Sequence, residues 1–138
     1  MGIDVTQFPT AAHLASWAGV CPGNNESAGK RIRSKTRKGS PWLRRMACQS
    51  AWAAARTKNT YLSAQFKRLA ARRGRKCAII AVAHSILVIG YHLQHRQCTY
   101  TDLGSSYFDR LNADGLKRYL VKRLESLGHS VTLQPRAA

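Results

Sequence analysis

A long apolar run, CAIIAVAHSILVIGYHL, occupies residues 77–93 of the 138-residue chain. A helix formed by this run would be apolar on nearly all sides, as helices in a protein core or in a bilayer are. The run is shorter than the ~20 apolar residues of a usual membrane span, and it contains two histidines and a glycine. We therefore predict a buried core helix over residues 75–95.

Other helices are predicted on both sides of this run by capping residues and apolar spacing. Thr10 can cap a short helix over residues 11–17, and Ser40 followed by Pro41 suits the start of a helix that ends near Arg56. A third helix is expected to start near Asn59 or Thr60 and to end before Gly74. Apolar residues at helical spacing predict one more helix near the C-terminal end of the sequence. That last helix spans residues 114–127, with Leu116, Leu120, Leu124 and Leu127 as its stripe.

Small residues recur at helical spacing in the helix expected over residues 41–56, and such a stripe lets a neighbouring helix approach closely. The stripe consists of Leu43, Met46, Ala47, Ser50, Ala51 and Ala54. Residues 100–108 are aromatic and are predicted to pack back as a short turn or helix, while residues 130–133 could form a short strand. The fold class is therefore mainly α, a compact domain of about five helices.

The stretch from residue 22 to residue 45, PGNNESAGKRIRSKTRKGSPWLRR, differs from the rest of the chain. Residues 23–39 show no apolar periodicity, so we predict a long basic loop, and residues 97–138 are predicted to be a C-terminal extension. Cationic residues are dense here and no acid falls among them: Lys30, Arg31, Arg33, Lys35, Arg37, Lys38, Arg44 and Arg45. Such a run can be a solvated cluster, but it can also grip phosphates.

The overall charge favours the phosphate interpretation. Lys and Arg number 23 against six acids, which gives a formal net charge of +17, and no Asp or Glu occurs from Lys30 to Thr101. A polyanionic partner is then favoured over a small neutral substrate. Because the cations are spread over a loop rather than along one amphipathic helix, nucleic acid is favoured over a membrane.

Two residue types in this stretch could act on a nucleic acid. Ser27 is a candidate nucleophile between small residues and the cations, although no base is close to it in sequence and a loop serine is often only solvated. Trp42, beside the basic run, is the best candidate for stacking on bases. Trp17 and Trp52 are assigned to the core. The glycine spacing does not match a phosphate-binding P-loop, which disfavours nucleotide hydrolysis.

Metal chemistry is not indicated within the chain. The four cysteines contain no C-x-x-C pair and are expected to be free thiols in a reducing cytoplasm. The histidines have no carboxylates near them in sequence, and the acids form no recognisable catalytic pair: Asp4, Glu26, Asp102, Asp109, Asp114 and Glu125. We predict no metal site and no cofactor held by this chain.

Ordered motifs over most of the chain resemble those of a known family. They are FPTAAHLASWAGVCPGNNESAGKR, KGSPWLRRMACQSAWAA, YLSAQFKRLAARRGRKCAIIAVAHSILVIGYHL, YTDLGSSYFDR and RLESLGHSVTL. Together they are similar to the C-terminal half of bacterial insertion-sequence transposases that have an N-terminal RuvC-like DEDD domain. These enzymes are also called bridge-RNA-guided recombinases.

The resemblance implies that residues 1–138 form the C-terminal serine domain of a transposase. In the family, a serine after a W/Y-x-G-x-x-P motif is implicated as the nucleophile that joins DNA. Here that motif is WAGVCP, residues 17–22, and the serine in place is Ser27. The resemblance further implies DNA as partner, a structured guide RNA, several transposase protomers, and a bacterial, nucleoid-associated, cytoplasmic location without a membrane. Mg²⁺ is expected only with the RuvC-like domain.

The chain departs from the family pattern because it lacks the DEDD half. It is therefore expected to be a truncated transposase that is inactive without a RuvC-like partner. The alternative is a non-catalytic basic module for DNA or RNA, or an inactive remnant. A ribosomal-type RNA-structuring protein fits the charge but not the ordered motifs.

Overall fold

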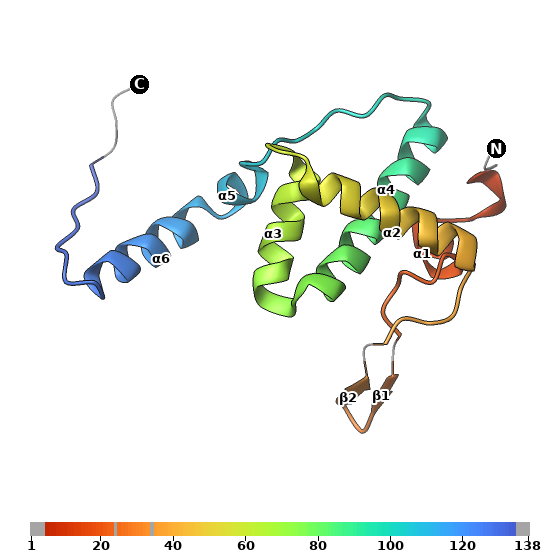
Figure 1. Cartoon of the computed structure of the whole chain (residues 1–138), viewed down its shortest axis with the longest axis horizontal. Helices are drawn as coiled ribbons and strands as arrows, with labels where there is room; N and C mark the ends of the chain where they lie inside the picture. Colours follow the sequence, from red (N-terminus) through yellow and green to blue (C-terminus); the bar gives the residue numbers. More distant parts are fainter. Residues whose placement is uncertain (1–4, 24, 34, 135–138) are drawn as a thin grey trace. The chain divides into compact units, whose positions relative to one another are not determined.

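The computed structural model describes residues 5–23, 25–33 and 35–134, with residues 25–27 and 31–33 described by their backbone. It is mainly helical, as predicted (Figure 1). The chain divides into two compact units, Met1–Ser105 and Ser106–Ala138. Asp4, one of the six acids considered above, lies outside the described residues.

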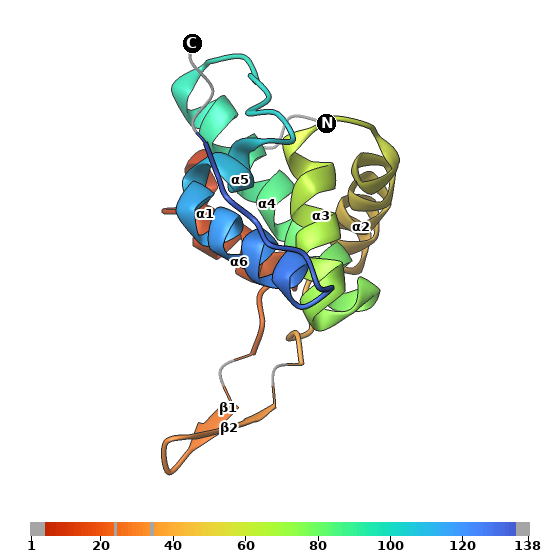
Figure 2. The same cartoon turned by 90° about the vertical axis from the view of Figure 1, so that its left-hand side faces the viewer.

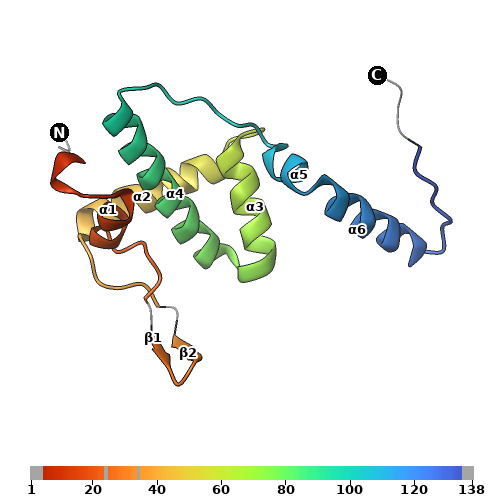
Figure 3. The same ribbon diagram turned by 180° about the vertical axis from the view of Figure 1, so that it is seen from behind.

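Helix α4 (Arg75–Arg96) is the centre of the first unit. It packs against α1 (Ala11–Trp17), α2 (Pro41–Arg56) and α3 (Tyr61–Arg73), and Figure 3 shows it among these helices from behind. Its residues Ile79, Val82 and Ala83 are buried with alanines of α1 and α2. Of the helices in the described ranges, α4 alone is long and apolar enough to cross a membrane by length and composition. It is the central helix of this unit, as predicted, but only five of its 22 residues are buried: Ala78, Ile79, Val82, Ala83 and Tyr91.

The first helices begin where their capping residues were predicted. The Thr10 hydroxyl accepts from the His13 N–H at the start of α1, and the Ser40 hydroxyl accepts from the Leu43 N–H at the start of α2, with Pro41 in the first turn. A short 3-10 helix, η1 (Val5–Gln7), precedes α1. A second apolar cluster forms there, because Val5, Ala11 and Leu14 pack on Tyr91 of α4.

The start of α3 is tied to the segment that leaves α4. Thr60 caps α3 by accepting from the Ser63 N–H, and the Asp102 carboxylate accepts from the Tyr61 N–H at 3.0 Å. Asp102 also accepts from the Gly104 N–H at 2.7 Å and from the Tyr100 hydroxyl at 2.9 Å. Desolvation acts to raise the pKa of Asp102, but these hydrogen bonds outweigh it and leave the pKa lowered. One carboxylate thus joins two segments that lie 41 residues apart.

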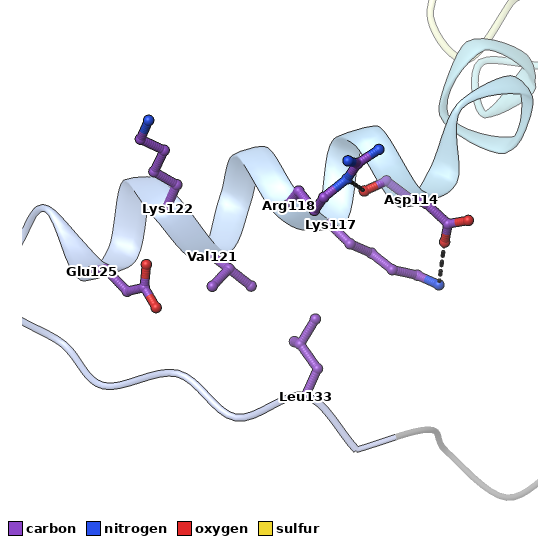
Figure 4. A pocket seen from close by; sticks show the side chains of 7 residues that line it. All are labelled: Asp114, Lys117, Arg118, Val121, Lys122, Glu125 and Leu133. Atoms are coloured by element: carbon purple, nitrogen blue, oxygen red, sulfur yellow. Dashed lines mark hydrogen bonds and ion pairs between the residues drawn. The ribbon is translucent and has the colours of Figure 1, made fainter.

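The second unit contains α5 (Tyr107–Leu111) and α6 (Ala113–Glu125). The Asn112 side chain accepts from the Gly115 N–H and caps α6. Leu116, Leu120 and Leu124 of the predicted stripe lie on α6, but Leu127 lies beyond its end. Leu120 and Leu124 are 48% and 43% exposed. The chain after α6 returns alongside it, so that Leu133 lies opposite Val121 (Figure 4).

Several expectations about the fold are wrong in detail. Residues 130–133 form no strand. The described residues contain one pair of strands, within residues 25–33, and those strands pair with each other. The described residues form six α-helices, which agrees with the expected five and the short turn or helix expected in the aromatic segment, where α5 forms. Met46 and Ser50 lie on the exposed face of α2, while Ala47 and Ala51 carry its buried face.

The two tryptophans assigned to the core are also partly on the surface. Trp17 is 54% exposed and Trp52 is 39% exposed. Each packs against one phenylalanine, with ring centroids 5.5 Å apart for Trp17 and Phe8 and 6.2 Å apart for Trp52 and Phe66. A ring of this size can pack on one neighbour and still leave much of its surface in water.

Candidate nucleic-acid interface

The stretch predicted to be a loop is a β-hairpin that projects from the helices (Figure 2). Strand β1 (Asn25–Ser27) pairs antiparallel with β2 (Lys30–Arg33), with Ser27 opposite Lys30 and Glu26 opposite Arg31. The two residues of the turn, Ala28 and Gly29, have φ of 50° and 71°. Positive φ at both central residues is what a type I′ hairpin turn requires. Periodicity missed this hairpin because its strands are short and polar.

The base of the hairpin is closed by a second set of backbone contacts. Pro22 forms a bridge with Thr36, and the Gly23 N–H donates to the Lys35 carbonyl at 3.0 Å. Further down, the Ser40 N–H donates to the Trp17 carbonyl at 2.9 Å. The described residues within 19–39 therefore form one basic arm, which is paired between β1 and β2 at its tip and by these backbone contacts at its base.

Glycines allow the two sides of the arm to meet at its base. A Cβ placed on Gly39 would lie 2.6 Å from both the Trp17 carbonyl oxygen and the Gly19 Cα, and Gly19 itself has φ of +72°. Only glycine accepts this approach without displacing backbone. Ala18 and Val20, on either side of Gly19, are buried in the core of the first unit. The motif at residues 17–22 thus fastens the arm to the core.

Cationic and aromatic side chains gather at the same base. The Arg44 guanidinium donates to the Thr36 hydroxyl at 2.8 Å, which joins α2 to the arm. The Arg45 guanidinium lies over the Trp42 ring, 5.5 Å from its centroid, in a cation–π arrangement. Trp42 is 75% exposed, so its ring is open to a partner.

The predicted site residues fall into two groups along the arm. Ser27 and Lys30 flank the turn at the tip, and the backbones of Arg31 and Arg33 follow in β2. The other group belongs to the base and to the first turns of α2, and its members Lys35, Arg37, Lys38, Trp42 and Arg45 are exposed while Arg44 is half-buried. The structure therefore separates the candidate nucleophile from the candidate stacking residue by the length of the arm.

Cysteines close to the base of the arm are poor competitors for a nucleophilic role. Burial raises the pKa of the Cys21 thiol. Burial also raises the pKa of Cys48, against the opposing effect of the nearby Arg44 charge. Because the thiolate is the reactive form of cysteine, both groups stay less reactive than a free thiol.

Metal-binding groups do not cluster in the part of the chain that the structure describes. No three His, Cys, Asp or Glu side chains there lie close enough to hold one ion. Asp102 already accepts three kinds of hydrogen bond, as described above. A divalent ion normally needs several converging oxygen ligands, and the described acids do not supply them.

Comparison with known proteins gives one family. Residues 1–67 match the transposase IS116/IS110/IS902 family, and the match runs from the N-terminus through the arm and α2 into α3. This supports a transposase of that family and a role in DNA transposition, with DNA as the partner. No match is found among the curated proteins or among the solved structures.

Proposed function

We propose that this chain is the DNA-binding and strand-transfer part of an insertion-sequence transposase, with Ser27 as the nucleophile. The observation that supports the proposal most directly is the position of Ser27, at the tip of a basic arm within the residues that match the family. Ala28 beside it holds a left-handed backbone that a non-glycine residue seldom adopts. Such local strain is common at functional sites.

The proposed step is a transesterification at phosphorus. The Ser27 oxygen attacks a DNA phosphodiester, the bond from phosphorus to one sugar oxygen breaks, and a phosphoserine ester forms. The serine proton passes to a base, and the departing sugar oxygen takes up a proton. A second DNA hydroxyl later reverses the exchange and releases the serine, so strands are joined without hydrolysis.

The arm and the start of α2 are proposed to hold the phosphates around this step. Lys30, Arg31 and Arg33 would bind the DNA backbone near the tip, with Lys35, Arg37, Lys38, Arg44 and Arg45 nearer the base. Contacts of this kind position DNA without reading its sequence. Counterion release then predicts a log–log slope of affinity against salt on the order of −4 to −8 for duplex DNA. A flat salt response would exclude a phosphate-binding arm.

Other components are proposed from the family resemblance. Mg²⁺ would be held by the carboxylates of a RuvC-like domain, since the described acids of this chain do not converge. A guide RNA and further transposase protomers would complete the assembly, in the bacterial cytoplasm at the nucleoid. The bound ion would stabilise charge on the phosphate during the exchange.

A covalent-trapping assay tests the nucleophile. The chain is mixed with a RuvC-like domain, Mg²⁺, guide RNA and labelled DNA, and is then run on a denaturing gel. A shifted band is expected for the unchanged chain and for Ser50→Ala, an exposed serine on α2, but not for Ser27→Ala. A band of equal intensity from Ser27→Ala would refute the assignment.

The second candidate is a non-catalytic module that binds DNA or RNA. The separation of the described carboxylates favours it, because the chain would need another protein for chemistry. It predicts that nucleic acid is bound but that no covalent band appears, under conditions in which a full-length transposase gives one.

A further inference from the structure

A second basic surface lies at the corner where α3 meets α4. Its cations lie within ten consecutive positions, all of them exposed: Lys67, Arg68, Arg72, Arg73, Arg75 and Lys76. Neither helix contains an acidic residue. The corner is therefore a concentrated positive patch on the first unit, separate in sequence from the arm.

The corner holds its cations on ordered backbone. Only Gly74 separates the end of α3 from the start of α4, and it has φ of 82°. Its N–H donates to the Ala70 carbonyl, and its carbonyl accepts from the Ala78 N–H, so the turn is closed on both sides. Cations on such a turn lose less freedom on binding than cations on a flexible loop would.

Helix stability does not account for the whole patch. Arg72 and Arg73 are in the last turn of α3, where a cation favours the helix, but Arg75 and Lys76 are in the first turn of α4. A cation there lies near the positive end of the helix dipole and disfavours the helix. Both side chains are exposed, so core packing does not account for them either.

The corner and the arm belong to the same compact unit. In Figures 1, 2 and 3 the turn between α3 and α4 is at the lower end of the helical body, and the hairpin projects downward from that same end. A long polyanion that lies along the arm could therefore reach the corner as well.

We propose that the α3–α4 corner is a second phosphate-binding surface, which contacts the backbone of the same double-stranded DNA as the arm. The proposal rests on the DNA-binding part of the function proposed above. Residues 67–76 contain no aromatic side chain, so the corner is suited to backbone contacts rather than to stacking on bases. It would fix the direction in which the duplex leaves the arm.

Two variants of equal charge test the proposal. The corner variant carries Arg72→Gln, Arg75→Gln and Lys76→Gln. The control carries Arg56→Gln, Lys58→Gln and Arg96→Gln, exposed cations at or beyond the C-terminal ends of α2 and α4. Each variant loses three of the 23 cations, so that long-range attraction falls equally. Circular dichroism and thermal melting check that both variants fold.

Duplex DNA affinity is measured from 50 to 200 mM salt. Three lost phosphate contacts should make the corner variant's log–log slope shallower by about 2.7 than that of the unchanged chain. The ratio of the affinity of the unchanged chain to that of the corner variant should then fall by roughly 40-fold between 50 and 200 mM salt. The control variant should keep the slope of the unchanged chain.

An arm variant, Lys30→Gln with Lys35→Gln and Lys38→Gln, separates the two proposals. If it loses affinity while the corner variant behaves like the control, the corner proposal is overturned and the arm stands. If the arm variant keeps full affinity and slope, the DNA-binding part of the proposed function fails. If the corner effect appears with duplex RNA but not with duplex DNA, the assignment to DNA is wrong.

Discussion

Replacing Gly39 by alanine should destabilise the fold, because it separates the two sides of the arm at its base. The new Cβ would lie 2.6 Å from the Trp17 carbonyl oxygen and from the Gly19 Cα, so backbone would have to move. Overpacking of this kind costs about 1–3 kcal/mol. Loss of the hydrogen bond from the Ser40 N–H to the Trp17 carbonyl adds about 1 kcal/mol. The expected loss of unfolding free energy is about 2–4 kcal/mol.

Urea and thermal unfolding followed by circular dichroism measure this loss, and a melting temperature lower by roughly 8–16 °C is expected for a unit of this size. Gly90→Ala is the matched control, because a Cβ at this exposed position in α4 meets nothing within 4 Å. It should stabilise the helix by about 0.5–1 kcal/mol. A Gly39→Ala protein as stable as the unchanged chain would refute the proposed packing of the arm base.

Asp102 should make the stability of the fold depend on pH in the acid range. Its pKa is lowered in the fold, so its stabilisation is present above its unfolded pKa near 3.8 and is lost as pH falls through the lower folded value. Asp102→Asn should remove that part of the dependence in melts between pH 2 and 5, and an unchanged profile would exclude the role. Burial, with the hydrogen bond to Asp102, raises the pKa of Tyr100 to about 12, so its contribution is present below pH 10 and is lost between 10 and 12. Tyr100→Phe should make the melting temperature depend less on pH between 10 and 12. If the variant keeps the pH dependence of the unchanged chain, this role of Tyr100 is wrong. Trp42→Ala should weaken binding of single-stranded oligonucleotides by about 1–3 kcal/mol for each stacked base and leave duplex affinity nearly unchanged. Met46→Ala, exposed one turn further along α2, is its control, and equal losses in both variants would argue against stacking.

Much of the helical framework could be predicted because its signals are local. Thr10, Ser40 and Thr60 each accept a hydrogen bond from an N–H three residues later, and such a cap depends on few neighbours. The exposure of Trp17 and Trp52 could not be predicted in this way. Their exposure depends on whether residues distant in the sequence pack over them, and the composition of the chain does not determine that packing.

The residues of the candidate site could be predicted from the sequence, but the hairpin conformation of its backbone could not. The density of cations from Lys30 to Arg45 is visible in the sequence, and so is Ser27. The hairpin was missed, although positive φ at Ala28 and Gly29 explains why a small residue and a glycine stand there. A glycine after a small residue, between two polar stretches of similar length, was the available signal.

The sequence by itself determined the helix starts, the core helix and the uneven charge, since each follows from residue types at fixed local spacing. Tertiary structure alone decided that Gly19 meets Gly39 and that Asp102 holds the start of α3. It also decided that the α3–α4 corner lies at the same end of the body as the arm (Figure 1). These relations join residues far apart in the chain, and they exist only after packing around α4 has brought those residues together.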